Sequence, residues 1–264
     1  MTWLLFVLAA GLGALAVGLI GFGSSLVILP TLAVVCPTMF ASEVALRLAT
    51  GTTMATMTVG ALSAGTAQAR GGRVAWPLLR LAILPYLVGA LSGPWGARFL
   101  PVQALRLYIA TLLVLLGLWA LRPRARVPTR GRDWQAHRAE IAAVLFVVGL
   151  ASSAAGIASG VFAIPYLSRF SLPLRTIIGT STFGAALYCV FGTVGYVSAG
   201  WGWDELPAWS LGFVYLPAFA VMSTAAAICG PWGVRLAGRV SEGFLRRLLA
   251  LFLLGAAAVI AWGT

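Results

Sequence analysis

The sequence predicts an all-α integral membrane protein made of two inverted repeats, each a re-entrant or broken helical hairpin followed by three transmembrane helices. Of its 264 residues, 61% are hydrophobic and only 9% are charged, whereas an average soluble domain is about 25% charged. The uncharged runs 48–69, 176–203 and 206–234 each exceed the ~20 residues that a helix needs to cross the membrane. This composition excludes a soluble enzyme, and the lack of alternating apolar and polar residues argues against a transmembrane β-barrel.

Three short motifs occur in both halves of the chain, in the same order. Residues 21–30 (GFGSSLVILP) match 156–165 (GIASGVFAIP), residues 47–53 (RLATGTT) match 175–181 (RTIIGTS), and residues 93–98 (GPWGAR) match 230–235 (GPWGVR). Ordered matches at nearly constant spacing indicate a duplicated chain. We therefore expect a first membrane repeat over 1–121, a basic polar linker over 122–140 and a second membrane repeat over 141–264.

Within each repeat, a long uncharged stretch that carries the Gly/Ser motif precedes three helices of transmembrane length. We expect these helices over 47–69, 74–97 and 102–121 in the first repeat, and over 175–199, 207–229 and 244–262 in the second. Glycine permits a turn in the middle of each Gly/Ser stretch. Backbone groups freed by such a break are tolerated in a membrane only where protein buries them or where they line a polar cavity. Two breaks therefore predict one central site.

Arginine placement favours hairpins over single crossings for the two Gly/Ser stretches. All 18 basic residues are arginines, and eight crossings would divide them evenly between the two sides. Hairpins would instead place all but Arg47, Arg98 and Arg106 on one side and make the second repeat inverted, as the positive-inside rule prefers. We therefore predict a multi-pass protein of the bacterial inner (plasma) membrane, with periplasmic termini and a cytoplasmic 122–140 linker. Both re-entrant hairpins and broken spanning helices fit these patterns.

The repeated motifs resemble those of a known family over essentially the whole chain. The Gly-rich segment that ends in proline, the R-x-x-x-G-T-[TS] start of the next helix and the duplicated eight-segment layout are similar to the TauE/SafE sulfite exporter family, also called the toluene sulfonate uptake permease family. The resemblance implies transport of a sulfur-containing anion, such as sulfite or an organosulfonate, by export in some members and uptake in others. The chain departs from the family's usual glycines at Ser24, Ser25 and Ala158.

Small and hydroxyl-bearing residues of the repeated motifs form the candidate substrate site. A helix that starts after a break offers free N–H groups and a partial positive charge to an anion, and hydroxyls add donors for the acceptor oxygens of a sulfonate. The residues selected on this ground are Gly21, Gly23, Ser24, Ser25, Thr52, Thr53, Gly156, Ser159, Gly160, Thr180 and Ser181. Alternatively, the small residues serve close helix packing, and the hydroxyls bond only to carbonyls of their own helices.

Arg47 and Arg175 begin the equivalent motif helices, and we expect them on opposite faces of the membrane. Their guanidinium groups match the edge of a sulfonate and could attract the anion or gate its path. Snorkelling of these side chains to the membrane interface is the ordinary alternative. The six carboxylates of the chain all fall in loops or near helix ends, so we expect no intramembrane proton relay of the usual kind.

These patterns predict an exporter of a small sulfur-containing anion that works by alternating access at a midplane site. An inside-negative membrane expels each negative charge with about 2.3 kcal/mol per 100 mV, so such an exporter needs no coupling ion. Na⁺- or H⁺-coupled uptake of a similar anion is the alternative, and a membrane scaffold that transports nothing is a third reading.

The expected partners are the small anion, membrane lipid and a possible coupling ion, and an oligomer is possible. No nucleic acid is expected, because the arginines lie between apolar runs and mark loops. No cofactor, metal or enzyme activity is expected either, because Cys36, Cys189 and Cys229 stand apart from one another and from any histidine, and catalytic motifs are missing.

Overall fold

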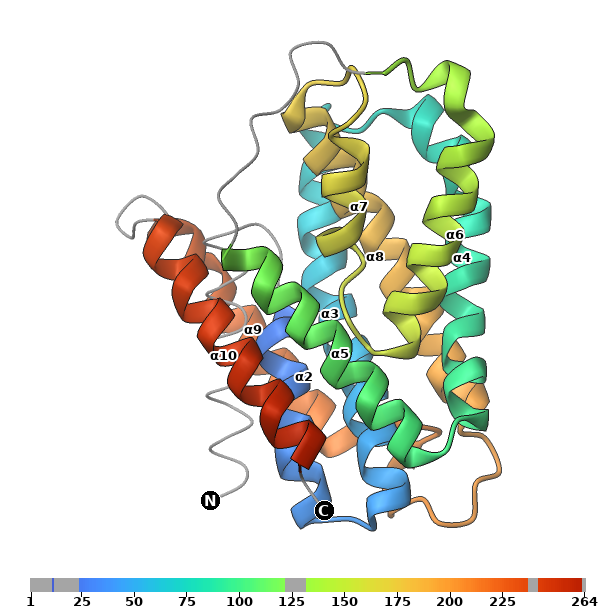
Figure 1. Cartoon of the computed structure of the whole chain (residues 1–264), viewed down its shortest axis with the longest axis vertical. Helices are drawn as coiled ribbons and strands as arrows, with labels where there is room; N and C mark the ends of the chain where they lie inside the picture. Colours follow the sequence, from blue (N-terminus) through green and yellow to red (C-terminus); the bar gives the residue numbers. More distant parts are fainter. Residues whose placement is uncertain (1–10, 12–23, 122–131, 237–241, 263–264) are drawn as a thin grey trace.

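The structure is a computed structural model that describes residue 11 and residues 24–121, 132–236 and 242–262, and these residues are mostly helical (Figure 1). The elements in chain order are α2 (Ser24–Val35), η1 (Cys36–Thr38), α3 (Ser42–Arg70), α4 (Trp76–Phe99), α5 (Val102–Leu121), η2 (Gln135–His137), α6 (Arg138–Ala154), α7 (Gly160–Leu167), α8 (Leu174–Ala199), β1 (Ser210–Leu211), β2 (Val214–Tyr215), α9 (Leu216–Leu236) and α10 (Glu242–Trp262). The prediction of an all-α architecture is confirmed for this part of the chain.

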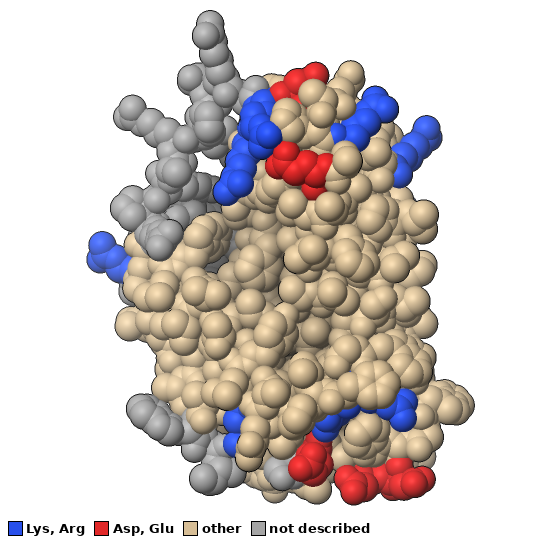
Figure 2. Space-filling view, turned by 45° about the vertical axis from the view of Figure 1, so that its right-hand side comes forward, with Lys and Arg blue, Asp and Glu red and all other residues tan. Residues whose placement is uncertain are grey.

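Four of the described helices are long and apolar enough to cross a membrane. They lie within Trp76–Phe99, Val102–Trp119, Gln135–Ala154 and Arg175–Ala199. Most charged side chains in the view of Figure 2 gather at the two ends of the molecule, and a wide, largely uncharged surface separates them. Large apolar side chains such as Leu84 and Leu107 are more than half exposed on this surface, which suits a lipid environment far better than water. The protein is therefore an integral membrane protein.

The two ends of the molecule differ in charge. Helices α3 and α7 end, and α4, α6 and α8 begin, at the end drawn uppermost in Figure 1. We call it the arginine-rich end, because the residues at or next to these helix termini are Arg70, Arg73, Arg132, Arg138, Arg169 and Arg175. At the opposite end, α3 begins and α4 and α8 end, and the loop there carries Asp204 and Glu205.

Helices α6 and α7 form a hairpin that returns to the end at which it starts (Figure 1). Its outer ends are joined by a short parallel bridge between Arg132 and Phe170. The N–H of Arg132 donates to the carbonyl of Arg169, and the N–H of Ser171 donates to the carbonyl of Arg132, both at 3.0 Å. The second Gly/Ser stretch is thus a helical hairpin, as predicted. Much of its expected counterpart near the start of the chain lies outside the described residues.

Helix α3 lies between two hydrophobic cores. One core is built mainly from α2, α5, α9 and α10, and the other mainly from α4, α6, α7 and α8. Ala49 of α3 belongs to the first core, and Met54 of the same helix belongs to the second. Helix α4 packs along α6 and α8, and α3 packs along α8, so the two halves of the chain share an extensive contact.

Glycines of the R-x-x-x-G-T-[TS] motifs allow each half to approach the backbone of the other. A Cβ atom on Gly51 would stand 2.1 Å from the carbonyl oxygen of Phe213, and one on Gly179 would stand 2.3 Å from the carbonyl oxygen of Arg73. Real Cβ atoms do not come this close to backbone, so a larger residue at either position would push the halves apart. This contact gives a packing reason for the repeated glycine.

Most helix boundaries lie within about five residues of those predicted, but the predicted helix over 207–229 is wrong at its start. Helix α9 begins at Leu216, because a loop with a two-stranded antiparallel hairpin, β1–β2, precedes it. Positive φ angles at Gly202, Trp209 and Gly212 are incompatible with a continuous helix. Helix α6 already begins at Arg138, so the first turn of α6 belongs to the segment expected to be a linker, 122–140.

Candidate functional site

The break between α6 and α7 lies against the motif helix α3. Gly156 has a φ of +66°, and a Cβ atom there would stand 2.8 Å from the carbonyl oxygen of Thr50. Only glycine combines this left-handed conformation with such a close approach. The N–H of Ile157 donates to the carbonyl oxygen of Ser152 at 2.9 Å and closes the end of α6. The chain then passes Ser159 and enters α7 at Gly160.

Four buried or half-buried tyrosines from α4, α5 and α8 hold this break in place. Three of them donate to backbone carbonyl groups at the end of α6 and in the break, and the fourth bonds a serine hydroxyl. The contacts are Tyr108 to Ala151 at 2.7 Å, Tyr196 to Ser153 at 2.6 Å, Tyr188 to Ile157 at 2.8 Å, and Tyr86 to the Oγ of Ser159. None of these tyrosines is among the candidate site residues predicted from the sequence. The available signal was their place inside apolar helices, where a phenol hydroxyl needs a partner.

The two Gly/Ser segments touch at this break. The backbone N–H of Ala158 donates to the Oγ of Ser25 at 2.9 Å, across 133 positions of the sequence. Ser25 and Ser159 are both fully buried. Of the other candidates in these segments, Ser24 is the first residue of α2 and Gly160 the first of α7. Gly21 and Gly23 lie outside the described residues.

Two hydroxyls of the candidate site each join one half of the chain to the other. The Oγ1 of Thr52 accepts the N–H of Tyr215 at 3.0 Å, and the Oγ1 of Thr180 accepts the N–H of Ala75 at 2.9 Å. Tyr215 and Ala75 both immediately precede a helix, α9 and α4 respectively. The two contacts are therefore the same contact made with the halves exchanged.

The remaining two hydroxyls of the cluster differ from each other. Thr53 donates to the carbonyl of Ala49 in its own helix at 2.7 Å, which is the ordinary alternative considered for these residues. Ser181 is buried, and its Oγ has no hydrogen-bond partner within the described part of the chain. A buried hydroxyl without a partner costs free energy, so Ser181 is the member of the cluster that is available to bind a ligand or a water.

Ser181 lines a small cavity between α4, α6, α7 and α8. The cavity has a volume of about 30 Å³, and its other lining residues include Leu78, Leu167, Thr180 and Tyr86. This is room for about one water molecule. The cavity lies on the arginine-rich side of the break, because its lining comes from the first turns of α4 and α8 and the last turn of α7.

Arg47 and Arg175 lie at opposite ends of the molecule. Arg175 is exposed near the start of α8. Arg47 is only 4% exposed and is enclosed by protein. Its Nη2 donates to the carbonyl of Leu100 at 2.8 Å, and its guanidinium lies 5.1 Å from the ring centre of Trp203. Arg47 thus binds carbonyls beyond the end of α4, and its buried Nε has no partner among the described residues.

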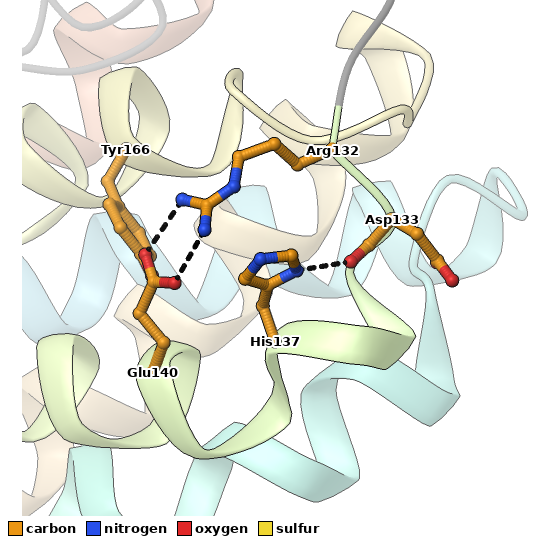
Figure 3. Close-up of polar contacts among 5 residues, drawn as sticks. All are labelled: Arg132, Asp133, His137, Glu140 and Tyr166. Carbon is orange, nitrogen blue, oxygen red and sulfur yellow. Dashed lines mark hydrogen bonds and ion pairs between the residues drawn. The ribbon is translucent and has the colours of Figure 1, made fainter.

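A polar cluster fastens the outer ends of the α6–α7 hairpin at the arginine-rich end (Figure 3). Arg132 forms a two-pronged ion pair with Glu140, with both N–O distances at 3.2 Å, and the hydroxyl of Tyr166 donates to the same carboxylate. The Nδ1 of His137 lies 2.8 Å from the carbonyl oxygen of Asp133. These groups hold the start of α6 against α7 and lie far along the hairpin from its break.

The carboxylates of the described residues lie at helix ends or in loops rather than at the break. Glu43, Asp133, Asp204 and Glu205 are exposed near helix ends or in loops. Among the described residues, no three His, Cys, Asp or Glu side chains are grouped so that they could hold a metal ion. What the break offers is therefore hydroxyl groups and aromatic rings beside the start of α7, which suit a small anion better than a metal.

Comparisons with known proteins identify the family of this chain. The profile of the family described as "Sulfite exporter TauE/SafE" matches residues 5–260. A "Probable membrane transporter protein" of Haemophilus influenzae is 27% identical over 263 residues, which cover 95% of each chain. Relatives of the same description from Xylella fastidiosa strains Temecula1 and 9a5c are each 27% identical over 262 residues, which cover 96% of this chain and 93% of theirs. No solved structure is a significant match. The chain belongs to the TauE/SafE family of membrane transporters.

Proposed function

We propose that this transporter exports a small sulfur-containing anion, sulfite or an organosulfonate, by alternating access at the junction of its two Gly/Ser segments. The observation that carries the proposal is the contact between Ser25 and the N–H of Ala158, 133 residues apart. It brings the two repeated segments to one place in the interior of the protein. A single substrate site between two breaks is the arrangement that transporters built from repeats use.

The chemistry of this junction suits an anion. Ser159 and Ser25 supply hydroxyls beside Gly160, the first residue of α7, whereas the N–H groups of Val161 and Phe162 already donate to the carbonyls of Ala158 and Ser159 at 3.4 and 3.0 Å. The partial positive charge at the start of α7 adds to their attraction for negative oxygens. An ionised sulfonate or sulfite group offers acceptor oxygens to these donors, and the described carboxylates are too distant to repel it.

Contacts between the halves support two inverted repeats that rock about the junction. Thr52 with Tyr215 and Thr180 with Ala75 form one contact twice, with the halves exchanged. Such an exchange is expected when two similar repeats are related by a two-fold axis. If the axis lies in the membrane plane, tilting one repeat against the other closes the site on one side and opens it on the other.

Transport by purified protein in liposomes tests this function. Vesicles loaded with sulfite or sulfoacetate should release it faster when the potential drives anions outward, because each charge gains about 2.3 kcal/mol per 100 mV. Equal release of every loaded anion at every potential would contradict the proposal. Uptake that stops when Na⁺ is removed, or that follows a proton gradient, would instead establish the coupled uptake alternative.

Substitution of the junction serines tests the site. Ser159→Ala and Ser25→Ala each remove one hydroxyl, so they should weaken anion binding by about 0.5–1.5 kcal/mol, or about 2- to 13-fold in Kd. Ser168→Ala is the matched control, because that hydroxyl bonds Pro165 in its own turn at the far end of α7. Binding is measured by titration calorimetry on protein that elutes as a single species. Unchanged binding in both junction variants would move the site to the Thr52 and Thr180 cluster.

A further inference from the structure

Tyr86 separates the cavity near the arginine-rich end from the break. Its side chain lines the cavity together with Thr180 and Ser181, and its ring stacks on that of Tyr188 at 5.3 Å between ring centres. Its hydroxyl forms a hydrogen bond with the Oγ of Ser159. One side chain therefore contacts both the cavity and the serine that begins the returning arm of the hairpin.

The residues that line the cavity extend along α4 from near its start at the arginine-rich end to this tyrosine. Leu78, two residues into α4, and Tyr86 both line it, and they are about 12 Å apart along the helix axis. Thr180 has its hydroxyl engaged with both Thr176 and Ala75. The hydroxyl of Ser181 is unpartnered among the described residues and buried. The cavity thus offers one free donor next to a closed hydrogen bond.

We propose that Tyr86 is the gate of the transport path on the arginine-rich side, closed by its hydrogen bond to Ser159. When this side of the protein opens and the cavity widens, an entering anion first meets Ser181. When the bond between Tyr86 and Ser159 opens, both hydroxyls turn to the anion and the path continues to the break. The identity of the anion rests on the proposed function, whereas the barrier itself does not.

The energetics of hydrogen bonding favour such a gate. Without substrate, Tyr86 and Ser159 satisfy each other in a site with little room for water, so the closed state is the stable one. Hydrogen bonds to charged oxygens are about twice as strong as those between neutral groups. An anion can therefore replace the single neutral bond with two stronger ones, whereas a water molecule gains less from the exchange.

Cysteine labelling in the full-length protein tests the gate directly. Gly160→Cys places a thiol next to Ser159 beyond Tyr86, and Gly184→Cys places one in the cavity before it. A Cβ atom at either position meets only ordinary contacts, of 3.9 Å at Gly160 and 3.5 Å at Gly184. Both variants are made after replacing Cys36, Cys189 and Cys229 with alanine, and the anionic reagent (2-sulfonatoethyl) methanethiosulfonate is applied to purified protein.

The decisive variant is Tyr86→Phe, which keeps the ring and removes the hydroxyl. If the hydrogen bond is the gate, this change should speed modification of Gly160→Cys about 10-fold, the equivalent of one lost hydrogen bond. Modification of Gly184→Cys should change less than about 2-fold, because that thiol lies before the gate. Equal rates at Gly160→Cys with and without the hydroxyl, in protein of unchanged elution volume, would overturn the proposal. So would a rate that rises only in Tyr86→Ala, because the ring would then be the barrier.

A protection measurement separates this inference from the proposed function. Sulfoacetate at saturating concentration should slow modification of Gly160→Cys in the Tyr86→Phe protein, because it occupies the break. If Tyr86→Phe speeds labelling but sulfoacetate gives no protection, the gate stands and the proposed substrate class is wrong. If sulfoacetate protects but Tyr86→Phe has no effect on labelling, the substrate class stands and the gate is wrong.

Discussion

At the scale of single residues, recurrence in the sequence located the important positions but could not assign their roles. Thr52 and its counterpart Thr180 both bond the other half of the chain. A hydroxyl that recurs in the sequence permits this contact but does not show whether it binds a ligand or the protein. Thr53 and its counterpart Ser181 differ: one bonds its own helix and the other has no described partner. That difference depends on which neighbours surround each helix. Neighbours come from distant sequence, so periodicity within one helix cannot reveal it.

The repeated glycine of the motif leads to the first prediction at this scale. Gly51→Ala and Gly179→Ala would each force a Cβ atom against backbone of the other half, and such overpacking costs about 1–3 kcal/mol. Gly60→Ala is the matched control, because nothing lies within 4 Å of a Cβ there and alanine favours a helix by about 0.5–1 kcal/mol. Thermal unfolding in detergent should show lower midpoints for the first two variants and no decrease for the control. A midpoint of Gly51→Ala equal to that of Gly60→Ala would contradict close packing at this site.

At the scale of elements, the sequence predicted the hairpin and failed at the loop before α9. The hairpin followed from charge, since arginines flank both ends of its Gly/Ser stretch. Residues 207–215 of this loop carry no charge and run directly into α9, so the end of the loop and the start of the helix cannot be told apart by charge. Trp209 at φ +67° and the β1–β2 pair arise because this segment packs on the ends of α3 and α8. Three of the four tyrosines that hold the break were missed for a similar reason, because their partners are backbone carbonyls that carry no sequence signal.

Arg98 fixes that loop to the first half, and its removal is the prediction at this scale. Its Nη1 donates to the carbonyl of Ala199, the last residue of α8, at 2.7 Å, and its guanidinium lies 5.5 Å from the centre of the Trp203 ring. Arg98→Met keeps the apolar stem and should destabilise the protein by about 1–2 kcal/mol. Hydrogen–deuterium exchange should rise over 200–215. Arg80→Met on the exposed face of α4 is the control. If exchange over 200–215 rose as much in Arg80→Met as in Arg98→Met, loss of charge rather than loss of the Arg98 contact would be responsible.

At the scale of the whole molecule, two arginines at the end opposite the arginine-rich end form hydrogen bonds within the protein, and these bonds explain their presence there. Arg47 bonds carbonyls beyond the end of α4, and Arg98 bonds the end of α8, so both are held by the protein. The exposed arginines at the arginine-rich end, such as Arg70 and Arg175, are free to set orientation by the positive-inside rule. Counting arginines alone predicted this asymmetry. The count could not reveal that Arg47 and Arg98, which lie at the opposite end, bond carbonyls at the ends of α4 and α8.

This asymmetry predicts that the arginine-rich end faces the cytoplasm and that the chain termini face the periplasm. With the three native cysteines replaced, Glu205→Cys in the loop at the opposite end and Ala136→Cys at the arginine-rich end place exposed thiols on the two sides. A membrane-impermeant maleimide added to intact cells should label only Glu205→Cys, and disrupting the membrane should make both react. The positive-inside rule acts through short loops with an excess of arginine, and the end with Asp204 and Glu205 carries little such excess. Labelling of Ala136→Cys alone would reverse the orientation, and equal labelling of both in intact cells would show that these two ends do not lie on opposite sides of the membrane.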